Sequence, residues 1–235
     1  MATWGRYEEM RPGQIDAVLA EAPIAYLPWG SLEWHGPQNP IGLDALKAHG
    51  LCIMAAERTG GVVWPPIFAG YETMKPHAGF RHTIEVPAEA VMALANAYLD
   101  QAADEGFRLV FILMGHYGGQ HMKAIRMAVE NWPKIRGRGS DMKILAFSDA
   151  ELRRCDSPYP AGDHAGACET SLMMHFRPDL VCLAELPSEG PVCGIEAGYG
   201  VGGEDPRTAT ADLGAALAEE IVTEIVTRVT QALSG

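Results

Sequence analysis

Three polar side chains in one short loop could bind a divalent metal ion. Glu33, His35 and Asp44 lie within residues 27–44, a segment rich in glycine and proline that directly follows an apolar run. Two carboxylates and an imidazole form a ligand set that divalent cations such as Zn²⁺ and Mn²⁺ prefer. Glu33 and His35 are two residues apart, so in an extended backbone their side chains project to the same side. The segment therefore predicts part of a metal site.

Two further segments carry side chains of the same kinds. His116 follows the apolar run 109–114 and is flanked by glycine, so we expect it at the carboxyl end of a parallel strand, where open α/β sheets bind their ligands. His164 and Glu169 lie five residues apart around a turn of small residues. Other roles stay open, because Glu169 could interact with a helix dipole and His164 could be a structural turn residue.

The intervening residues predict alternating strands and helices that would position these groups. Short apolar runs, typical of strands covered on both faces, occupy 24–29, 62–68, 109–114 and 143–147. Helical stretches are expected at 44–58, at 87–105, at 120–131 (ending before Pro133), and from Leu213 to Leu233, where apolar residues recur every fourth position. This alternation predicts a three-layer α/β/α sandwich with a mainly parallel central sheet, forming a single domain over residues 1–235.

Composition excludes several classes of function. The formal net charge of −12 argues against nucleic acid or an anionic membrane as the main partner. No apolar stretch approaches the ~18 residues that a membrane span needs, and the N-terminus lacks the apolar region of a signal peptide. The five cysteines include no Cys-x-x-Cys pair and are odd in number, so we expect a reduced, cytoplasmic setting.

Three glycine-flanked segments together resemble the creatininase (creatinine amidohydrolase) family. They read Gly30-Ser-Leu-Glu-Trp-His-Gly-Pro37 followed by Asp44, Met114-Gly-His-Tyr-Gly-Gly-Gln120, and His164-Ala-Gly-Ala-Cys-Glu-Thr-Ser171. The family patterns are Gly-Ser-x-Glu-x-His-Gly-Pro with a later Asp, an Asn-Gly-His-x-x-Asn-like segment, and His-Ala/Gly-Gly-x-x-Glu-Thr-Ser. Their matching order over roughly residues 20–185 makes the resemblance far more specific than any one motif alone.

The resemblance implies a hydrolase with two divalent metal ions per chain. Glu33, Asp44 and His116 would hold one ion, while His35 and Asp44 would contribute to the other, with Asp44 bridging the two. The creatinine-cleaving members supply a further glutamate at the position that Gly118 occupies here. We expect Glu169 to take that ligand place, if its loop folds inward.

The same resemblance implies roles in catalysis. His164 matches the catalytic histidine of the family, which would carry a proton to the leaving nitrogen, and Glu169 would share in catalysis as a ligand. A metal-bound water has its pKa lowered toward ~7, which gives hydroxide at neutral pH. The predicted reaction is attack of this metal-bound hydroxide on the carbonyl of a small cyclic amide, which leads to cleavage of its C–N bond. The chain is therefore expected to be an amidohydrolase acting on non-peptide bonds.

Three residues are candidates for binding the substrate: Tyr117, Trp34 and His77. Tyr117 could instead pack beneath its loop, His77 could be a satisfied polar residue, and Trp34 could pack in the core. Trp34 stands where family members often carry glutamine, and residues 150–162 lack the tryptophan that creatininases place there for stacking. These departures make creatinine itself a doubtful substrate.

Other functions are compatible with the same residues. A formamide deformylase or a C–C hydrolase of a cyclic ketone would use the same metal-bound hydroxide, and a non-catalytic metal-binding protein could keep the same fold. Oxygen and nitrogen ligands serve zinc, manganese and iron alike. Family resemblance alone further implies a homo-oligomer, commonly a hexamer.

Overall fold

The computed structural model describes residues 3–159 and 163–234. In this part of the chain one six-stranded sheet forms, with five strands in the order β1-β3-β2-β5-β6 and with β4 paired to β2. Every pairing between these strands is parallel. The strands are β1 (Trp4–Arg6), β2 (Ile24–Gly30), β3 (Gly61–Val63), β4 (Ile67–Phe68), β5 (Leu109–Met114) and β6 (Lys143–Ser148).

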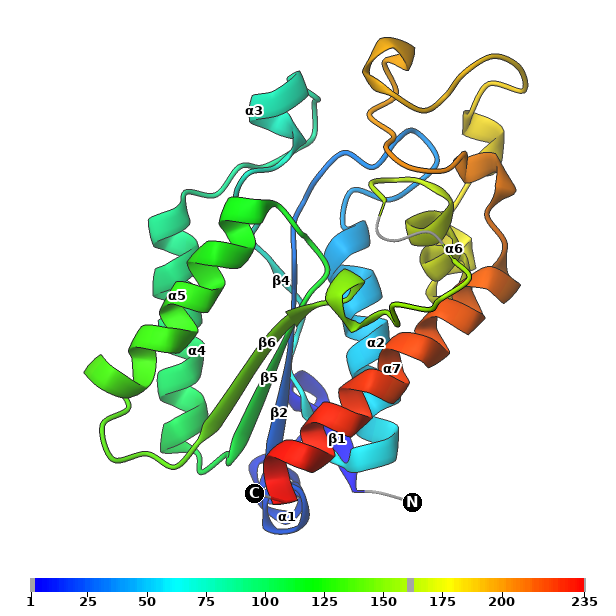
Figure 1. Ribbon diagram of the computed structural model, residues 1–235. Coiled ribbons are helices and arrows are strands. Elements are labelled where there is room, and N and C mark those ends of the chain that lie inside the picture. Colours follow the sequence, from blue (N-terminus) through cyan, green and yellow to red (C-terminus); the bar gives the residue numbers. More distant parts are fainter. Residues whose placement is uncertain (1–2, 160–162, 235) are drawn as a thin grey trace.

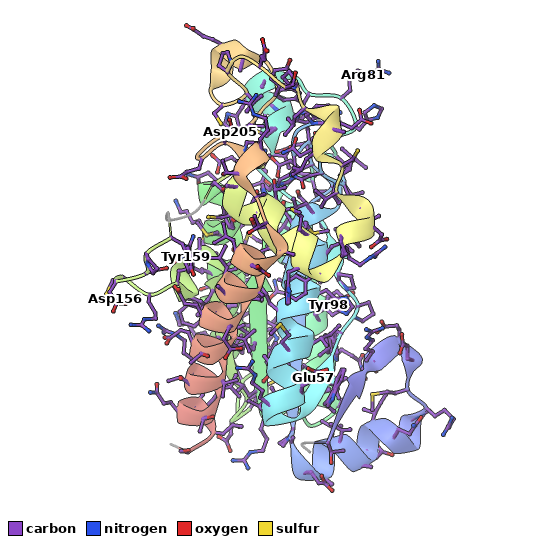
Figure 2. The ribbon with its side chains drawn as sticks, turned by 90° about the vertical axis from the view of Figure 1, so that its right-hand side faces the viewer. Glu57, Arg81, Tyr98, Asp156, Tyr159 and Asp205 are labelled. Carbon is purple, nitrogen blue, oxygen red and sulfur yellow. The ribbon has the colours of Figure 1, made fainter. Side chains whose placement is uncertain are left out.

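Helices cover both faces of the sheet, which confirms the predicted three-layer α/β/α sandwich. Figure 1 shows α4 and α5 on one face, and α2, α6 and α7 on the other. Figure 2 shows α2 and α7 side by side along that second face. The helices are α1 (Pro12–Glu21), α2 (Leu43–Thr59), α3 (Met74–Ala78), α4 (Ala88–Asp104), α5 (Gly119–Ile135), α6 (Ala167–Phe176) and α7 (Ala211–Ser234). None of the helices described combines the length and apolarity that crossing a bilayer would require.

The central strands are buried on both faces because successive side chains enter different helical layers. Phe111 of β5 belongs to the same buried cluster as Leu51 of α2. Its neighbour Ile112 belongs to a second cluster with Leu99 of α4 and Ile125 of α5. This double burial explains why β5 reads as an uninterrupted apolar run.

Two predicted elements differ from the structure. The strand expected at 62–68 is divided into β3 and β4, because Pro65 and Pro66 have no N–H to donate to a neighbouring strand. The helix expected to end before Pro133 instead runs to Ile135 as α5. Its last turn is held by Trp132, whose Nε1 donates to Asp100 Oδ1 at 2.8 Å. This anchor outweighs the backbone hydrogen bond that the proline cannot make.

Two elements near the N-terminus were not predicted. Strand β1 has three residues, and α1 buries only Val18, so neither presents a strong periodic pattern. Both lie away from the carboxyl ends of β2 and β5, which point toward the end of the molecule where α3 and the segment 187–207 are found (Figure 1). That end of the sheet carries the candidate site.

Candidate metal centre

The ends of β2 and β5 approach the first turn of α2 so closely that two positions require glycine. A Cβ atom at Gly30 would lie 2.2 Å from the backbone nitrogen of Ala45, and one at Gly115 would lie 2.1 Å from the carbonyl oxygen of Asp44. Both distances are far shorter than any carbon contact that packing allows. The two glycines therefore let Asp44, in the first turn of α2, sit directly above the ends of both strands.

One candidate ligand group consists of Glu33, Asp44 and His116, which are all buried and whose potential metal-binding atoms lie within 4.8 Å of one another. Nδ1 of His116 is 2.8 Å from Glu33 Oε2 and 3.3 Å from Asp44 Oδ2. The other ring nitrogen, Nε2, lies 2.9 Å from the carbonyl oxygen of Tyr71. Because a carbonyl oxygen can only accept, Nε2 carries the proton, and Nδ1 turns toward the carboxylates.

A second ligand group consists of His35, Asp44 and Glu169. Nε2 of His35 lies 3.0 Å from Asp44 Oδ1 and 3.6 Å from Glu169 Oε2. Its Nδ1 lies 3.0 Å from the carbonyl oxygen of Glu33, so Nδ1 is the protonated nitrogen and Nε2 faces the carboxylates. Asp44 belongs to both groups and presents a different oxygen to each histidine.

These two groups fit divalent metal ions. Histidines that bind metals usually donate the second ring N–H to a carbonyl or carboxylate, which fixes the tautomer. His35 and His116 both do so through backbone carbonyls. Within the described ranges, the buried Nε2 of His35 makes no hydrogen bond of good geometry. Oxygen and imidazole donors of this kind suit Zn²⁺, Mn²⁺ and Fe²⁺.

The charges of the cluster attract positive charge strongly. Burial lowers the pKa of His35, but Asp44, Glu169 and Glu33 outweigh it and raise the pKa to about 9. Burial likewise opposes the protonation of His116, yet Asp44 and Glu33 raise its pKa well above the ordinary value. Burial would raise the pKa of the Asp44 carboxyl group, but the two histidines outweigh this effect and hold the pKa well below its usual range. A cation bound here would take the place of these protons.

Glu169 reaches the cluster from the first turn of α6, where Asp163 fixes the start of the helix. The Asp163 carboxylate accepts hydrogen bonds from the backbone N–H groups of Cys168 at 2.7 Å and Glu169 at 3.1 Å. The chain reverses through Ala165, which has a left-handed φ of 57°. The N–H of Ala165 then donates to Glu169 Oε2 at 2.8 Å. This turn brings the Glu169 side chain inward, as its expected role as a ligand requires.

A buried lysine behind Glu169 was not predicted. Lys47 is fully buried in α2, and its Nζ donates to Oε1 of Glu169 and, at 2.6 Å, to the hydroxyl of Tyr117. Nζ also lies 3.2 Å from Asp149 Oδ2. Helical spacing in the sequence could have indicated that Lys47 is buried. Lys47 falls one turn after Asp44 and four residues after Leu43, on the face of α2 that points to the core.

The candidate substrate residues occupy different places. The Tyr117 hydroxyl donates to Glu169 Oε1 at 2.6 Å, and its side chain lines a cavity of 230 Å³ together with ligand residues of both groups. His77 lines this cavity and a neighbouring one of 560 Å³. Trp34 lines neither of these cavities; it stacks on Phe80 at 5.3 Å and donates to the carbonyl of Tyr199 at 2.7 Å. Trp34 therefore packs against Phe80, which lines the larger cavity, and does not itself line that cavity.

His164 lines both cavities and lies beside the ligand groups. Its ring centroid is 4.3 Å from that of His35, and a further ligand group contains Glu33, His35 and His164. Nε2 of His164 lies 2.9 Å from the carbonyl oxygen of Trp34, so Nε2 carries a proton and Nδ1 does not. Burial and the neighbouring His35 lower the pKa of His164. The imidazole is therefore neutral at pH 7 and able to accept a proton.

Known proteins resemble this chain over most of its length. Residues 8–229 match the family model described as "Creatininase: Creatinine amidohydrolase". Mycofactocin precursor peptide peptidase of Mycobacterium ulcerans (strain Agy99) is 34% identical over 239 residues, covering 91% of this chain and 87% of the relative. Creatinine amidohydrolase of Pseudomonas putida is 28% identical over 205 residues, covering 80% of this chain and 75% of the relative.

Solved structures resemble the chain in fold. A crystal structure of creatinine amidohydrolase superposes with a TM-score of 0.82 at 23% identity, covering 98% of this chain and 97% of that one. A structure described as "Creatininase Mn" gives a TM-score of 0.83 at 23% identity, and a creatininase variant described as "Zn-Zn type" gives 0.81 at 23% identity; each covers 98% of both chains. The fold of the chain is thus the one these structures share.

Proposed function

Because the chain belongs to the creatininase family, we propose that it is a metal-dependent hydrolase that cleaves an amide C–N bond. The observation that carries the proposal is the orientation of two imidazoles. His35 and His116 each give one N–H to a backbone carbonyl and turn the other nitrogen toward Asp44. That orientation is typical of metal-binding histidines.

Two ions would be held by residues that meet around Asp44. Glu33, Asp44 and His116 would hold one ion, and His35, Asp44 and Glu169 the other. Zinc and manganese are the proposed metals, with iron as a further candidate, and the structures described as "Creatininase Mn" and "Zn-Zn type" support this choice. When bound, such ions polarise a substrate carbonyl and lower the pKa of water toward about 7, which supplies a nucleophile at neutral pH.

His164 would move the proton in this reaction. Its Nε2–H is fixed by the carbonyl of Trp34, which leaves Nδ1 to take a proton from the attacking water. The same nitrogen would then deliver the proton to the departing amide nitrogen, so that no charged amide anion has to leave. Glu169 would be held in place for this step by Ala165 on one oxygen and by Lys47 and Tyr117 on the other. This proton transfer makes a purely metal-binding role the weaker alternative.

The leading substrate class is a small cyclic amide bound in the 230 Å³ cavity that the ligand residues line. A second candidate is an amide bond of a peptide. It is favoured by the adjoining cavity of 560 Å³, which is of the size that encloses drug-sized ligands, and by the 34% identity to a peptide peptidase. The two cavities share Met74, His77 and His164, so a longer substrate could extend from one into the other.

The proposal is tested with protein purified without chelator and loaded with Mn²⁺ or Zn²⁺. Turnover is measured on lactams, cyclic imides, formamides, cyclic ketones and short peptides, for the wild type and for His164→Ala. We expect the variant to bind metal as the wild type does and to lose about 100-fold or more in kcat. His175→Ala, in the last turn of α6, is the matched control and should keep full activity. A metal-loaded wild type that hydrolyses none of these compounds would contradict the proposal.

A further inference from the structure

Lys47, which contacts Glu169, is unusual because it places a positive charge next to a proposed cation site. Lys47 has no exposed surface, and its ammonium contacts the carboxylates of Glu169 and Asp149 as well as the hydroxyl of Tyr117. The ammonium also lies 4.3 Å from the centroid of the Tyr117 ring. We propose that Lys47 makes the two metal positions unequal, so that the position at His35, Asp44 and Glu169 binds its ion more weakly. This inference rests on the ligands assigned under the proposed function.

The two oxygens of Glu169 have different partners. Oε1 accepts hydrogen bonds from Lys47 and from Tyr117, which occupy it fully. Oε2 accepts from the backbone N–H of Ala165 at 2.8 Å and is the oxygen that faces His35 at 3.6 Å. Glu169 can therefore offer only one oxygen to an ion, and part of its negative charge is already neutralised by the ammonium.

Glu33, the corresponding glutamate of the other position, has no such neighbour. Its Oε1 accepts from the backbone N–H of Met74 at 2.6 Å, and its Oε2 lies 3.1 Å from the hydroxyl oxygen of Ser31, which donates its proton to Asp44 Oδ2 at 2.7 Å. Met74 and Ser31 bring no positive charge to Glu33. Across the ranges that the structure describes, no lysine or arginine forms an ion pair with Glu33. The ion held by Glu33, Asp44 and His116 thus meets carboxylates with their full charge.

Lys47 cannot move away from the second ion. The side chain leaves α2 one turn after Asp44 and is enclosed completely. Its Nζ is held between Asp149 Oδ2, at 3.2 Å, and the carboxylate of Glu169. The Lys47 ammonium and the second ion then share the carboxylate of Glu169 in a buried region, where water screens charges little. Their repulsion weakens the second position alone.

The test is calorimetric titration of metal-free protein with MnCl₂ at pH 7.5, with bound Mn²⁺ counted separately by electron paramagnetic resonance. We expect the wild type to bind one ion at least tenfold more tightly than the other. The double variant Lys47→Met/Asp149→Asn removes a buried ion pair without changing the net charge. In this variant the weaker position should bind its Mn²⁺ ion at least tenfold more tightly. The tighter position should stay within about threefold of the wild type.

Two further variants separate charge from structure. Asp149→Asn removes one of the two carboxylates that contact the ammonium, so the weaker position should bind its ion still more weakly. This single variant decides the matter if the double variant does not fold. Tyr117→Phe removes one hydrogen bond from Glu169 but keeps Lys47, and it should preserve the inequality. Equal positions in the wild type, or a second position that weakens in the double variant, would overturn the inference. Failure of the wild type to bind Mn²⁺ at all would contradict the metal assignment itself.

Discussion

Oδ1 of Asp44 lies 3.0 Å from Nε2 of His35, and the carboxylate is buried between this histidine and a second one. Its other oxygen, Oδ2, lies 3.3 Å from Nδ1 of His116 and accepts a hydrogen bond from the hydroxyl of Ser31 at 2.7 Å. One side chain therefore joins the two ligand groups. Its position depends on two strand ends that carry glycine, which connects the backbone of the sheet directly to the proposed chemistry.

Removal of the shared carboxylate should affect both metal positions at once. We expect Asp44→Asn to lower the affinity for both ions by 100-fold or more, on the order of 3 kcal/mol each. Glu33→Gln, which changes a ligand of one group, should weaken one ion strongly and the other only slightly. Metal content after dialysis against metal-free buffer measures both effects. Loss of a single ion in Asp44→Asn would show that the two groups are not joined through this residue.

The stability of the metal-free protein should fall as the pH rises. The pKa of His35 is about 9 in the folded protein, above its ordinary value of 6.5, so the folded state binds more protons between these values. The stabilisation is therefore complete below pH 6.5 and is lost as the pH passes through about 9; from His35 alone it is on the order of 3 kcal/mol. Urea unfolding at several pH values measures it. His35→Gln should flatten the dependence, and so should bound metal, which replaces the protons.

Substitution of the close-contact glycines should disturb the site without touching a ligand. Gly115→Ala would place a Cβ atom 2.1 Å from the carbonyl oxygen of Asp44, so α2 or β5 must shift. We expect a loss of stability of about 1–3 kcal/mol together with weaker metal binding. Gly13→Ala in α1 is the matched control, because a Cβ there meets nothing within 4 Å, and it should stabilise the protein slightly. Thermal unfolding and metal content are measured for both variants. Normal metal content in Gly115→Ala would show that the close contact at Gly115 does not affect metal binding.

The stacked pair of Trp34 and Phe80 should affect binding of the substrate more than turnover. The rings are 5.3 Å apart and inclined by only 4°, and they join α3 and its following loop to the segment around Tyr199. Trp34→Gln removes this stacking and loosens the wall of the 560 Å³ cavity. We expect KM to rise roughly fivefold to tenfold, as the loss of about 1 kcal/mol implies, with kcat nearly unchanged. A fall in kcat with unchanged KM would place Trp34 in the chemistry instead.

The periodicity of apolar residues, and the glycines and prolines between apolar segments, predicted the layers of the fold well. The double burial of β2 and β5 leaves uninterrupted apolar runs, and α7 shows its buried face at every fourth position. Periodicity could not place β1 or α1, because a three-residue strand and a helix with one buried side chain carry little pattern. It also failed at Pro133, where a tertiary contact between Trp132 and Asp100 prolongs the helix.

The candidate site was predictable where its residues cluster in sequence. Glu33, His35 and Asp44 share one loop, and His116 follows a strand, so their meeting could be expected from a parallel sheet. The contact between Lys47 and Glu169 joins residues that are 122 positions apart, and no local pattern reports it. Tyr117, a candidate for binding the substrate, lines the 230 Å³ cavity, and its hydroxyl contacts both Lys47 and Glu169. Assignments that depend on distant contacts required the structure.

Anomalous diffraction can show whether two ions bind around Asp44. Crystals of the protein grown with saturating Mn²⁺ are measured on both sides of the manganese absorption edge. We expect two anomalous peaks, one among Glu33, Asp44 and His116 and the other among His35, Asp44 and Glu169. If either group lacks a peak under these conditions, or if manganese binds only elsewhere, two ions do not bind around Asp44.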